Sequence, residues 1–365
     1  MKRGNAFRAV GLLLMAPSLS LLAADAPLVK LDEPAQRDKN RFGLSYRAGF
    51  GINAEFKNVG NVARGGDGAG RDPGPATGSG VDRFYDDGYN RVDISGNQGG
   101  LTWFWGYKNS SQISGSDTIE MHSTTVAPID SGKYDNDPQH GFELTYNREL
   151  GRGRNGKWAW GVEGGFGWTD VRIHDRRALA GGVTVITDSY SLGGVNPNVP
   201  PFSSEYPGHA GTYEGPGALI EDAPTRTVSS DRNGAAVEGE RNFDGDLFSF
   251  RVGPYIDLPL DDDWTISFSA GFAAGVIDGE YSFDQNVTTV GGTVRQTGSG
   301  SNTEALFGGY ASATIRYAIN QQWGLFVSGQ YVGLANCYEA EANGQSIELN
   351  LTRTGFVSVG VTYSF

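Results

Sequence analysis

The sequence predicts an all-β protein that crosses a membrane as an antiparallel up-and-down β-barrel. Apolar and polar residues alternate with a period of two from residue 41 onward, the polar positions carry mostly small side chains, and short links alternate with long ones. The 365 residues include 55 glycines, 7 Trp, 16 Tyr, 19 Phe and one Cys. One cysteine excludes an intrachain disulfide framework and a cysteine-based zinc cluster, and the aromatic content argues against disorder.

Residues 1–24 are predicted to be a secretory signal peptide. Lys2, Arg3 and Arg8 come before or at the start of an apolar run over residues 9–22, and small residues follow it. This is the order of a signal peptide, and the run is shorter than the roughly 20 residues that a spanning helix needs. We therefore expect export, a periplasmic segment over residues 25–40 and a barrel over residues 41–365.

Strict alternation defines the candidate strands. Period two places consecutive side chains on opposite faces of a strand. The apolar parity holds Phe42, Leu44, Tyr46, Phe50 and Phe56, then Trp158, Trp160, Val162, Phe166 and Trp168, then Phe248, Phe250, Val252 and Ile256, and then Trp264, Ile266, Phe268, Phe272 and Val276. Further alternating runs lie near residues 140–150, 304–319, 322–337 and 346–365.

The other parity decides which medium touches the apolar face. A water-soluble sandwich covers its second face with long charged side chains, whereas here that face carries Gly, Ser and Thr with scattered single charges. Small residues suit a tightly closed lumen, and lipid requires closure because an open edge leaves backbone groups unpaired. The pattern favours a barrel in lipid over a secreted sandwich.

The links set the topology and the number of strands. Short polar links at residues 151–157, 260–263 and 320–322 are typical of periplasmic turns, and long links at about 57–84, 174–241 and 284–302 of extracellular loops. Counting residues 57–138 as one excursion gives eight strands. Alternation around residues 92–107 suggests a further hairpin, so we expect about ten strands, with eight as the alternative.

The last strand carries a specific motif. Residues 355–365 read Gly-Phe-Val-Ser-Val-Gly-Val-Thr-Tyr-Ser-Phe, and one parity holds Val357, Val359, Val361, Tyr363 and Phe365. The segment resembles the carboxy-terminal signal of bacterial outer-membrane β-barrel proteins of the small-barrel, outer-membrane protein A or porin-like type. The resemblance implies recognition by the barrel assembly machinery and contact with outer-membrane lipid and lipopolysaccharide.

Charged residues on the inward parity form the candidate lumen network. They are Arg47, Glu55, Glu143, Glu163, Arg251, Asp257 and Arg316. Isolated buried charges are costly and persist when paired, so the residues predict a salt-bridged plug. The alternative is an ion or solute path, but barrels of eight to ten strands are only about wide enough for side chains or one small ligand.

Other motifs carry weaker hypotheses. Gly151–Lys157 matches glycine-rich phosphate-binding patterns, yet Trp158 begins a strand rather than a helix, which indicates a turn. His122 with Glu120, and His174 with Asp175, are candidates for a rim hydrolase, with exposed loop histidines as the alternative; His140 and His209 complete the histidines. Acidic residues in glycine-rich loops could bind calcium or be simply solvated: Asp67, Asp72, Asp86, Asp87, Asp135 and Asp137.

The sequence therefore predicts an exported outer-membrane barrel with a largely plugged lumen and a structural or surface-interaction role. A narrow porin or carrier and a rim hydrolase acting on lipid A or peptides are the alternatives, and no catalytic residue, metal or other cofactor is expected. The long link at residues 174–241 is the candidate site for an extracellular ligand. Nucleic acid is not expected as a partner, because the net charge of −13 opposes binding to phosphates.

Overall fold

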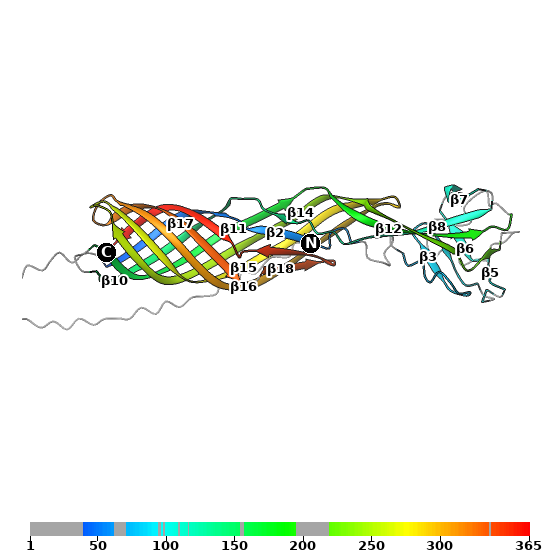
Figure 1. Ribbon diagram of the computed structural model, residues 1–365, viewed down its shortest axis with the longest axis horizontal. Helices are drawn as coiled ribbons and strands as arrows, with labels where there is room; N and C mark the ends of the chain where they lie inside the picture. The colour runs from blue at the N-terminus through cyan, green and yellow to red at the C-terminus, as the bar shows by residue number, and fades with distance from the viewer. Residues whose placement is uncertain are drawn as a thin grey trace, which may run out of the picture. The chain divides into compact units, whose positions relative to one another are not determined.

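Eight antiparallel strands close into a ring. The computed structural model describes residues 39–61, 71–93, 96–97, 99–108, 110–115, 117–153, 157–194, 219–335 and 337–365. Around the ring lie β1 (Asn40–Phe50), β10 (Gln139–Arg152), β11 (Ala159–Asp175), β14 (Thr225–Pro259), β15 (Trp264–Thr289), β16 (Gly292–Ala318), β17 (Trp323–Ala335) and β20 (Thr354–Ser364), and β20 pairs with β1 (Figure 1). Closure leaves no strand edge within the ring, as lipid requires.

The expectation of ten strands is wrong, and the alternative of eight holds. The described residues between 92 and 107 contribute no strand to the ring. Their short strands, β5 (Leu101–Thr102) and β6 (Trp105–Tyr107), pair with β13 (Ile220–Glu221) and β4 (Gly88–Asn90) instead. In this segment Trp105 and Tyr107 belong to a second hydrophobic core, whereas Leu101 and Trp103 of the same parity are exposed.

Two of the predicted long loops are largely strand. Over residues 284–302, β15 runs to Thr289 and β16 begins at Gly292, so a tight turn replaces the loop. Over residues 174–241, β12 (Leu179–Ser191) and the first part of β14 pair with each other. Glycine, threonine and aspartate are common in loops, and here they occupy exposed faces of strands that continue past the ring (Figure 1). The middle of the predicted loop, residues 195–218, lies outside the described residues.

The polarity of the strands inverts along their length. On β14 the outward parity is apolar from Ile256 to Phe248 and then becomes Asp246, Asp244, Asn242 and Glu240. The inward parity changes in the opposite sense, from Asp257 and Arg251 to Leu247 and Phe243, which are buried. On β15 the same inversion falls between Val276 and Asp278, and these residues pair with Phe248 and Asp246. The common level of the inversion marks the outer boundary of the lipid-facing belt.

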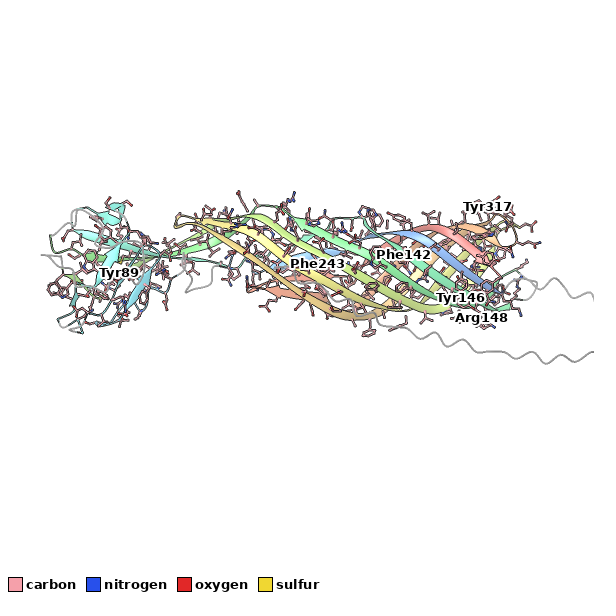
Figure 2. All side chains as sticks on the ribbon, turned by 180° about the vertical axis from the view of Figure 1, so that it is seen from behind. Tyr89, Phe142, Tyr146, Arg148, Phe243 and Tyr317 are labelled. Carbon is pink, nitrogen blue, oxygen red and sulfur yellow. The ribbon has the colours of Figure 1, made fainter. Side chains whose placement is uncertain are left out.

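Beyond that boundary, a second sheet packs against the inner face of the extended strands. It contains β18 (Cys337–Ala342), β19 (Gln345–Asn350), β2 (Asn53–Lys57) and β9 (Lys133–Tyr134), in that order. The two sheets enclose a hydrophobic cluster that includes Phe56, Phe243, Tyr281 and Ile347. Figure 2 labels Phe243 there, and Phe142 and Tyr146 on the wall of the ring. The ring is thus continuous with a sandwich whose core fills its outer end.

A separate hydrophobic cluster defines the outer subdomain. Its strands are β3 (Arg83–Tyr85), β4, β5, β6, β7 (Ile113–Ser114), β8 (Thr118–Val126) and β13, with a short 3-10 helix at Ser110–Gln112. The cluster is built from Tyr85, Trp105, Tyr107, Ile119, Met121, Tyr190, Leu192 and Ile220. β12 links it to the extended strands, because β12 pairs with β8 on one side and β14 on the other.

The described residues contain little helix. Within the described residues, no helix is long and apolar enough to cross a membrane, which says nothing of crossing by strands. The predicted signal peptide at residues 1–24 and nearly all of the segment at 25–40 lie outside the described residues.

The inversion predicts where lipid ends along β14. We expect a fluorophore on Phe250→Cys to be strongly quenched by a quencher carried on lipid acyl chains, and one on Asp244→Cys to be quenched little. Both side chains point outward, and six residues separate them by about 20 Å along the strand. Fluorescence in liposomes, with Cys337→Ser as the background, measures this. Equal quenching at both sites would place the boundary elsewhere.

Candidate functional site

The centre of the ring holds Arg251 between two carboxylates. Its Nε donates to Glu143 Oε1 at 2.8 Å, and its Nη1 donates to Glu163. Strands β10, β11 and β14 supply the three residues, and β11 pairs with both of the others, so the three side chains converge on one level. The guanidinium also lies over the Tyr310 ring, 4.9 Å from its centroid. Every charge in this group has an opposite partner.

Hydrogen bonds complete the coordination of Glu163. Asn147 Nδ2 donates to Oε2 at 2.6 Å, and Ser269 Oγ donates to Oε1 at 2.9 Å. Buried ions persist when their remaining lone pairs are satisfied in this way. Small residues leave the space that the network needs, since a side chain at Gly165 would collide with Arg251. The glycines of the inward parity are therefore part of the network's geometry.

A second ionic group lies toward the short turns. Asp257 accepts from Arg41 Nη1 at 3.0 Å and lies 3.6 Å from Arg316 Nη2, while Ser267 Oγ donates to it at 2.5 Å. Arg41 is absent from the predicted network, although it shares the inward parity of Arg47 six positions later. The sequence could have placed Arg41 in the network, because the alternation of β1 already includes its first residues.

Arg47 forms the third level. It is 1% exposed, donates from Nε and Nη2 to Thr169 Oγ1 at 2.9 and 2.6 Å, and lies 4.3 Å from the centroid of Phe356. Above it most inward side chains are apolar and belong to the sandwich core, which also encloses the buried pair of Arg241 with Asp175. Six of the seven predicted lumen residues therefore face inward, in three levels beneath an apolar seal.

The placement of Glu55 in the lumen is wrong. β1 ends at Phe50, and Gly51 adopts a φ of 77°, so the inward parity shifts from odd to even positions before β2. Ala54 and Phe56 are consequently buried in the core. Glu55 lies on the opposite face, in register with Glu348 of β19 and Lys133 of β9. The left-handed conformation of Gly51 shifts the parity by one residue, and the alternation of the sequence does not reveal such a shift.

The charged side chains of these three levels are all engaged with neighbouring groups. Each ionised group is held by an opposite charge or by a hydrogen-bond donor or acceptor, and the apolar layer offers ions no compensation for lost hydration. The outward face completes the picture, because Leu44, Phe250, Phe268 and Val359 are all about half exposed. Apolar side chains outside and paired charges inside are the inverse of a soluble protein. The chain forms a β-barrel of the outer-membrane type.

Comparisons with known proteins give matches of low identity and low TM-score. No family model matches the chain, and no curated protein matches its sequence. Among solved structures it is similar to Ail, the attachment invasion locus protein of Yersinia pestis, at 12% identity and a TM-score of 0.28, over 90% of this chain and 100% of Ail. It is also similar to the Ralstonia pickettii toluene transporter TbuX (8% identity, TM-score 0.16, 90% of each chain) and a Pseudomonas aeruginosa FadL homologue (8%, 0.18, 90% of this chain and 91% of that).

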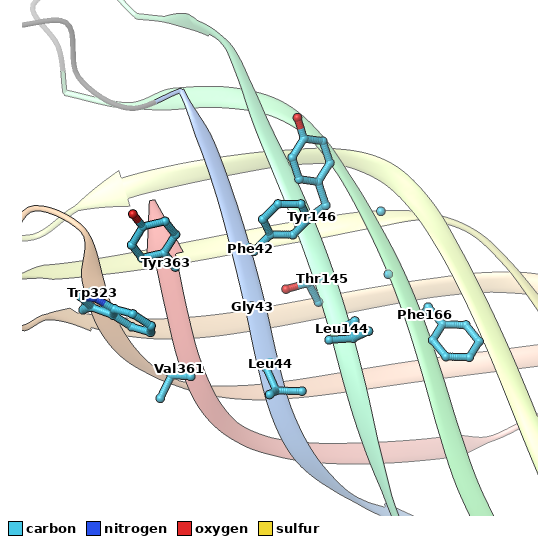
Figure 3. Close-up of a pocket in the computed structure, with 12 residues that line it drawn as sticks. Phe42, Gly43, Leu44, Leu144, Thr145, Tyr146, Phe166, Trp323, Val361 and Tyr363 are labelled. Carbon is cyan, nitrogen blue, oxygen red and sulfur yellow. The ribbon is translucent and has the colours of Figure 1, made fainter. Parts of the chain in front are cut away.

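The lipid-facing wall has a groove near the short-turn end. It encloses about 680 Å³ among aromatic and aliphatic side chains, including Phe42, Leu144, Tyr146 and Phe166 (Figure 3). Gly164 contributes to the gap on β11, where a Cβ would come no nearer than 3.9 Å to the carbonyl oxygen of Arg251. The residues of the predicted assembly signal lie on this same outer face: Val357, Val359, Val361, Tyr363 and Phe365. Their recognition by the assembly machinery stays a prediction.

Two candidate hydrolase histidines in the described part of the chain lie beside an aspartate, but the partners are not the predicted Glu120 and Asp175. His122 Nδ1 lies 2.7 Å from Asp87 Oδ2, and the backbone N–H of His122 donates to Asp87 Oδ1 at 2.7 Å. This hydrogen bond to Asp87 raises the pKa of His122. His174 Nδ1 contacts Asn242 Oδ1 at 2.9 Å and its Nε2 lies 3.8 Å from Asp244 Oδ1. Asp175 is paired with Arg177 and Arg241 instead. Among the described residues, no serine or cysteine side chain is recorded hydrogen-bonded to the His122 ring.

The candidate calcium ligands have structural partners. Asp86 accepts backbone N–H groups of Arg71 and Thr124, Asp72 accepts that of Gly74, and Asp137 accepts that of Gly51. Within the described part of the chain, no three His, Cys, Asp or Glu side chains are arranged to hold a metal ion. Asp67 and His209 lie outside the described residues.

The central network predicts a large effect on stability. Arg251→Ala leaves Glu143 and Glu163 without their cation, and we expect it to lower the free energy of unfolding by about 3–5 kcal/mol. Arg172→Ala, which breaks the exposed pair with Asp170, should change it by less than about 1 kcal/mol. Urea unfolding in detergent measures both variants. Similar values for the two would argue against a desolvated network.

The His122–Asp87 pair predicts a pH dependence in the outer subdomain. A raised pKa in the folded chain means that the stabilisation is fully present below about pH 6.5, the ordinary value, and is lost as the pH rises through the raised pKa. Amide exchange of β8, corrected for its intrinsic pH dependence, should therefore become faster over that range. Asp87→Asn should return the pKa of His122 toward its ordinary value in an NMR titration. An unchanged titration would contradict the assignment.

Proposed function

We propose that the chain is a closed outer-membrane anchor that presents a folded outer subdomain for surface interaction and does not conduct solutes. The observation that carries this proposal is the filled interior. Two paired ionic levels and the hydrogen-bonded Arg47 within the lipid belt are followed by the core of the sandwich, which contains Phe56, Phe243 and Tyr281. An ion moving along the axis would have to displace both layers.

The extension beyond the boundary supports a role at the outer surface. β14 continues from the inversion level at Leu247 to Thr225, which is 22 residues or about 70 Å of extended chain. Its outward side chains next to the boundary include Asp246, Asp244 and Glu240, as expected in water. A barrel that only stabilises the membrane has no need of such strands, whereas a stalk that carries a folded subdomain does.

The subdomain is built to be rigid. Tyr85 Oη contacts Asp188 Oδ2 and Tyr190 Oη at 2.6 Å each, and Arg226 Nη2 donates to Asp188 at 2.6 Å. Burial raises the pKa values of Tyr85 and Tyr190, so both stay neutral donors at physiological pH. A satisfied buried network of this kind fixes one arrangement of β3, β12 and β14. Binding surfaces placed on such a scaffold are preorganised.

Conductance across a planar bilayer tests the closed interior. We expect the wild-type barrel to give no current above background, and Phe56→Ala combined with Phe243→Ala to give a measurable leak because the apolar seal is thinned. Phe142→Ala faces lipid and serves as the control, with no leak expected. Heat-modifiable migration on gels confirms folding of each variant. Discrete channels in the wild type would overturn the proposal in favour of a narrow porin.

A further inference from the structure

β16 changes from an inner strand to an edge strand at Phe307. Toward the short turns, it pairs with β17 from Ala318 to Phe307. Toward the outside, Gly292–Leu306 pairs with β15 alone. Among the described strands, none forms a backbone ladder with the other side of this segment. It is therefore a free edge of about 15 residues, with backbone donors and acceptors directed away from β15.

β18 lies beside the edge but does not pair with it. Side chains make the connections instead: Asn343 Nδ2 donates to the carbonyl of Thr297 at 2.8 Å, and Asn302 Nδ2 donates to that of Glu339 at 2.8 Å. β18 crosses the inner face of β16 closely, since a side chain at Gly300 would collide with the carbonyl oxygen of Glu341.

A polar cleft occupies this seam. It encloses about 710 Å³, and its lining includes Ser301 and Asn302 on β16 and three carboxylates, Glu304, Glu339 and Glu341. The lining contains no lysine or arginine. The neighbouring Glu348 is already paired with Lys57. The wall of the cleft opposite the free edge is therefore anionic, and the described lining residues include no cation that would neutralise its carboxylates.

The edge lacks the devices that usually protect one. Exposed edges are commonly blocked by lysine, proline or a strong bulge. Residues 292–306 contain no lysine or proline, and Arg295 is engaged with Asp284 of β15, at 2.6 Å. The pairing of β15 with this segment proceeds without a register shift. The segment is thus a regular template on which another strand can form.

We propose that the outer edge of β16 is the docking site for an extended basic segment of another protein, which adds a strand beside Gly292–Leu306 and places lysine or arginine against Glu339 and Glu341. Backbone hydrogen bonds supply the contact, and the alternate side chains supply the selection. The inference rests on the proposed function, because it requires this face to be presented outside the membrane, and it names the partner's chemistry.

A second copy of this chain fits the site less well. Pairing of two β16 edges would bring Glu304, Glu339 and Glu341 of one copy toward the same acidic wall of the other. Like charges across an interface oppose association. A basic partner meets no such repulsion.

The test uses the full chain refolded in detergent and a nine-residue peptide that alternates valine and lysine. We expect binding by titration calorimetry, together with slower amide exchange in residues 292–306 and unchanged exchange in the ring. The same peptide with glutamate in place of lysine, and one N-methylated at alternate backbone positions, should not bind. No binding of the lysine peptide, or binding without protection of β16, would overturn the proposal.

Substitutions distinguish the contribution of the acidic side chains to peptide binding from that of the strand edge. Glu339→Gln combined with Glu341→Gln should weaken binding about fivefold to thirtyfold, because two exposed ion pairs are lost. Glu238→Gln combined with Glu280→Gln removes the same charge from exposed positions on β14 and β15, and should leave binding unchanged. Equal affinity in both double variants would overturn the acidic selection, and self-association by sedimentation without peptide binding would favour a dimer instead. Bilayer current is an independent readout, so a conducting barrel that still binds the peptide would contradict only the proposed function.

Discussion

Every strand in this barrel must satisfy two environments at once, because its alternate side chains face opposite sides. Inside the lipid belt, the outward parity must be apolar and the inward parity can be polar. Beyond it, the requirements are exchanged. β14 meets both demands with one unbroken strand that inverts its polarity between Phe248 and Asp246. The position of the membrane, the paired charges of the interior and the apolar core above them all follow from this inversion.

The inversion also determines which side chains fill the interior. A narrow ring leaves little room for water, so charges inside it persist only as pairs with satisfied hydrogen bonds. Arg251, with Glu143 on one side and Glu163 on the other, meets that condition. Once the inward parity becomes apolar, the same strands need a partner layer to cover it. The sheet from β18 to β9 supplies that layer, and the resulting sandwich core covers the outer end of the ionic levels.

The sequence was sufficient for the barrel and for six of its seven predicted lumen charges, because both depend on alternation within single strands. It was insufficient where a glycine changed the parity, as Gly51 did for Glu55. It also misjudged residues 284–302, since Gly, Ser and Thr occupy water-facing strands as readily as loops. The strand count failed for a related reason: apolar alternation near Trp105 reports burial, and burial in the outer subdomain cannot be distinguished from contact with lipid by period alone.

The extended strands have two outer edges, one on β14 and one on β16, and only the edge of β14 is covered by another described strand. On the far flank, β14 is paired first with β11 up to Arg241 and then with β12 from Val237 to Thr225, so this edge is covered along almost its whole length. On the other flank, β17 leaves β16 at Phe307 and the chain continues into β18, which crosses the inner face instead of extending the sheet. β12 covers the edge of β14, and no described strand covers the edge of β16 in the same way. The bare edge of β16 is therefore a distinct feature of the outer surface, and its acidic border gives it a chemistry that the covered edge lacks.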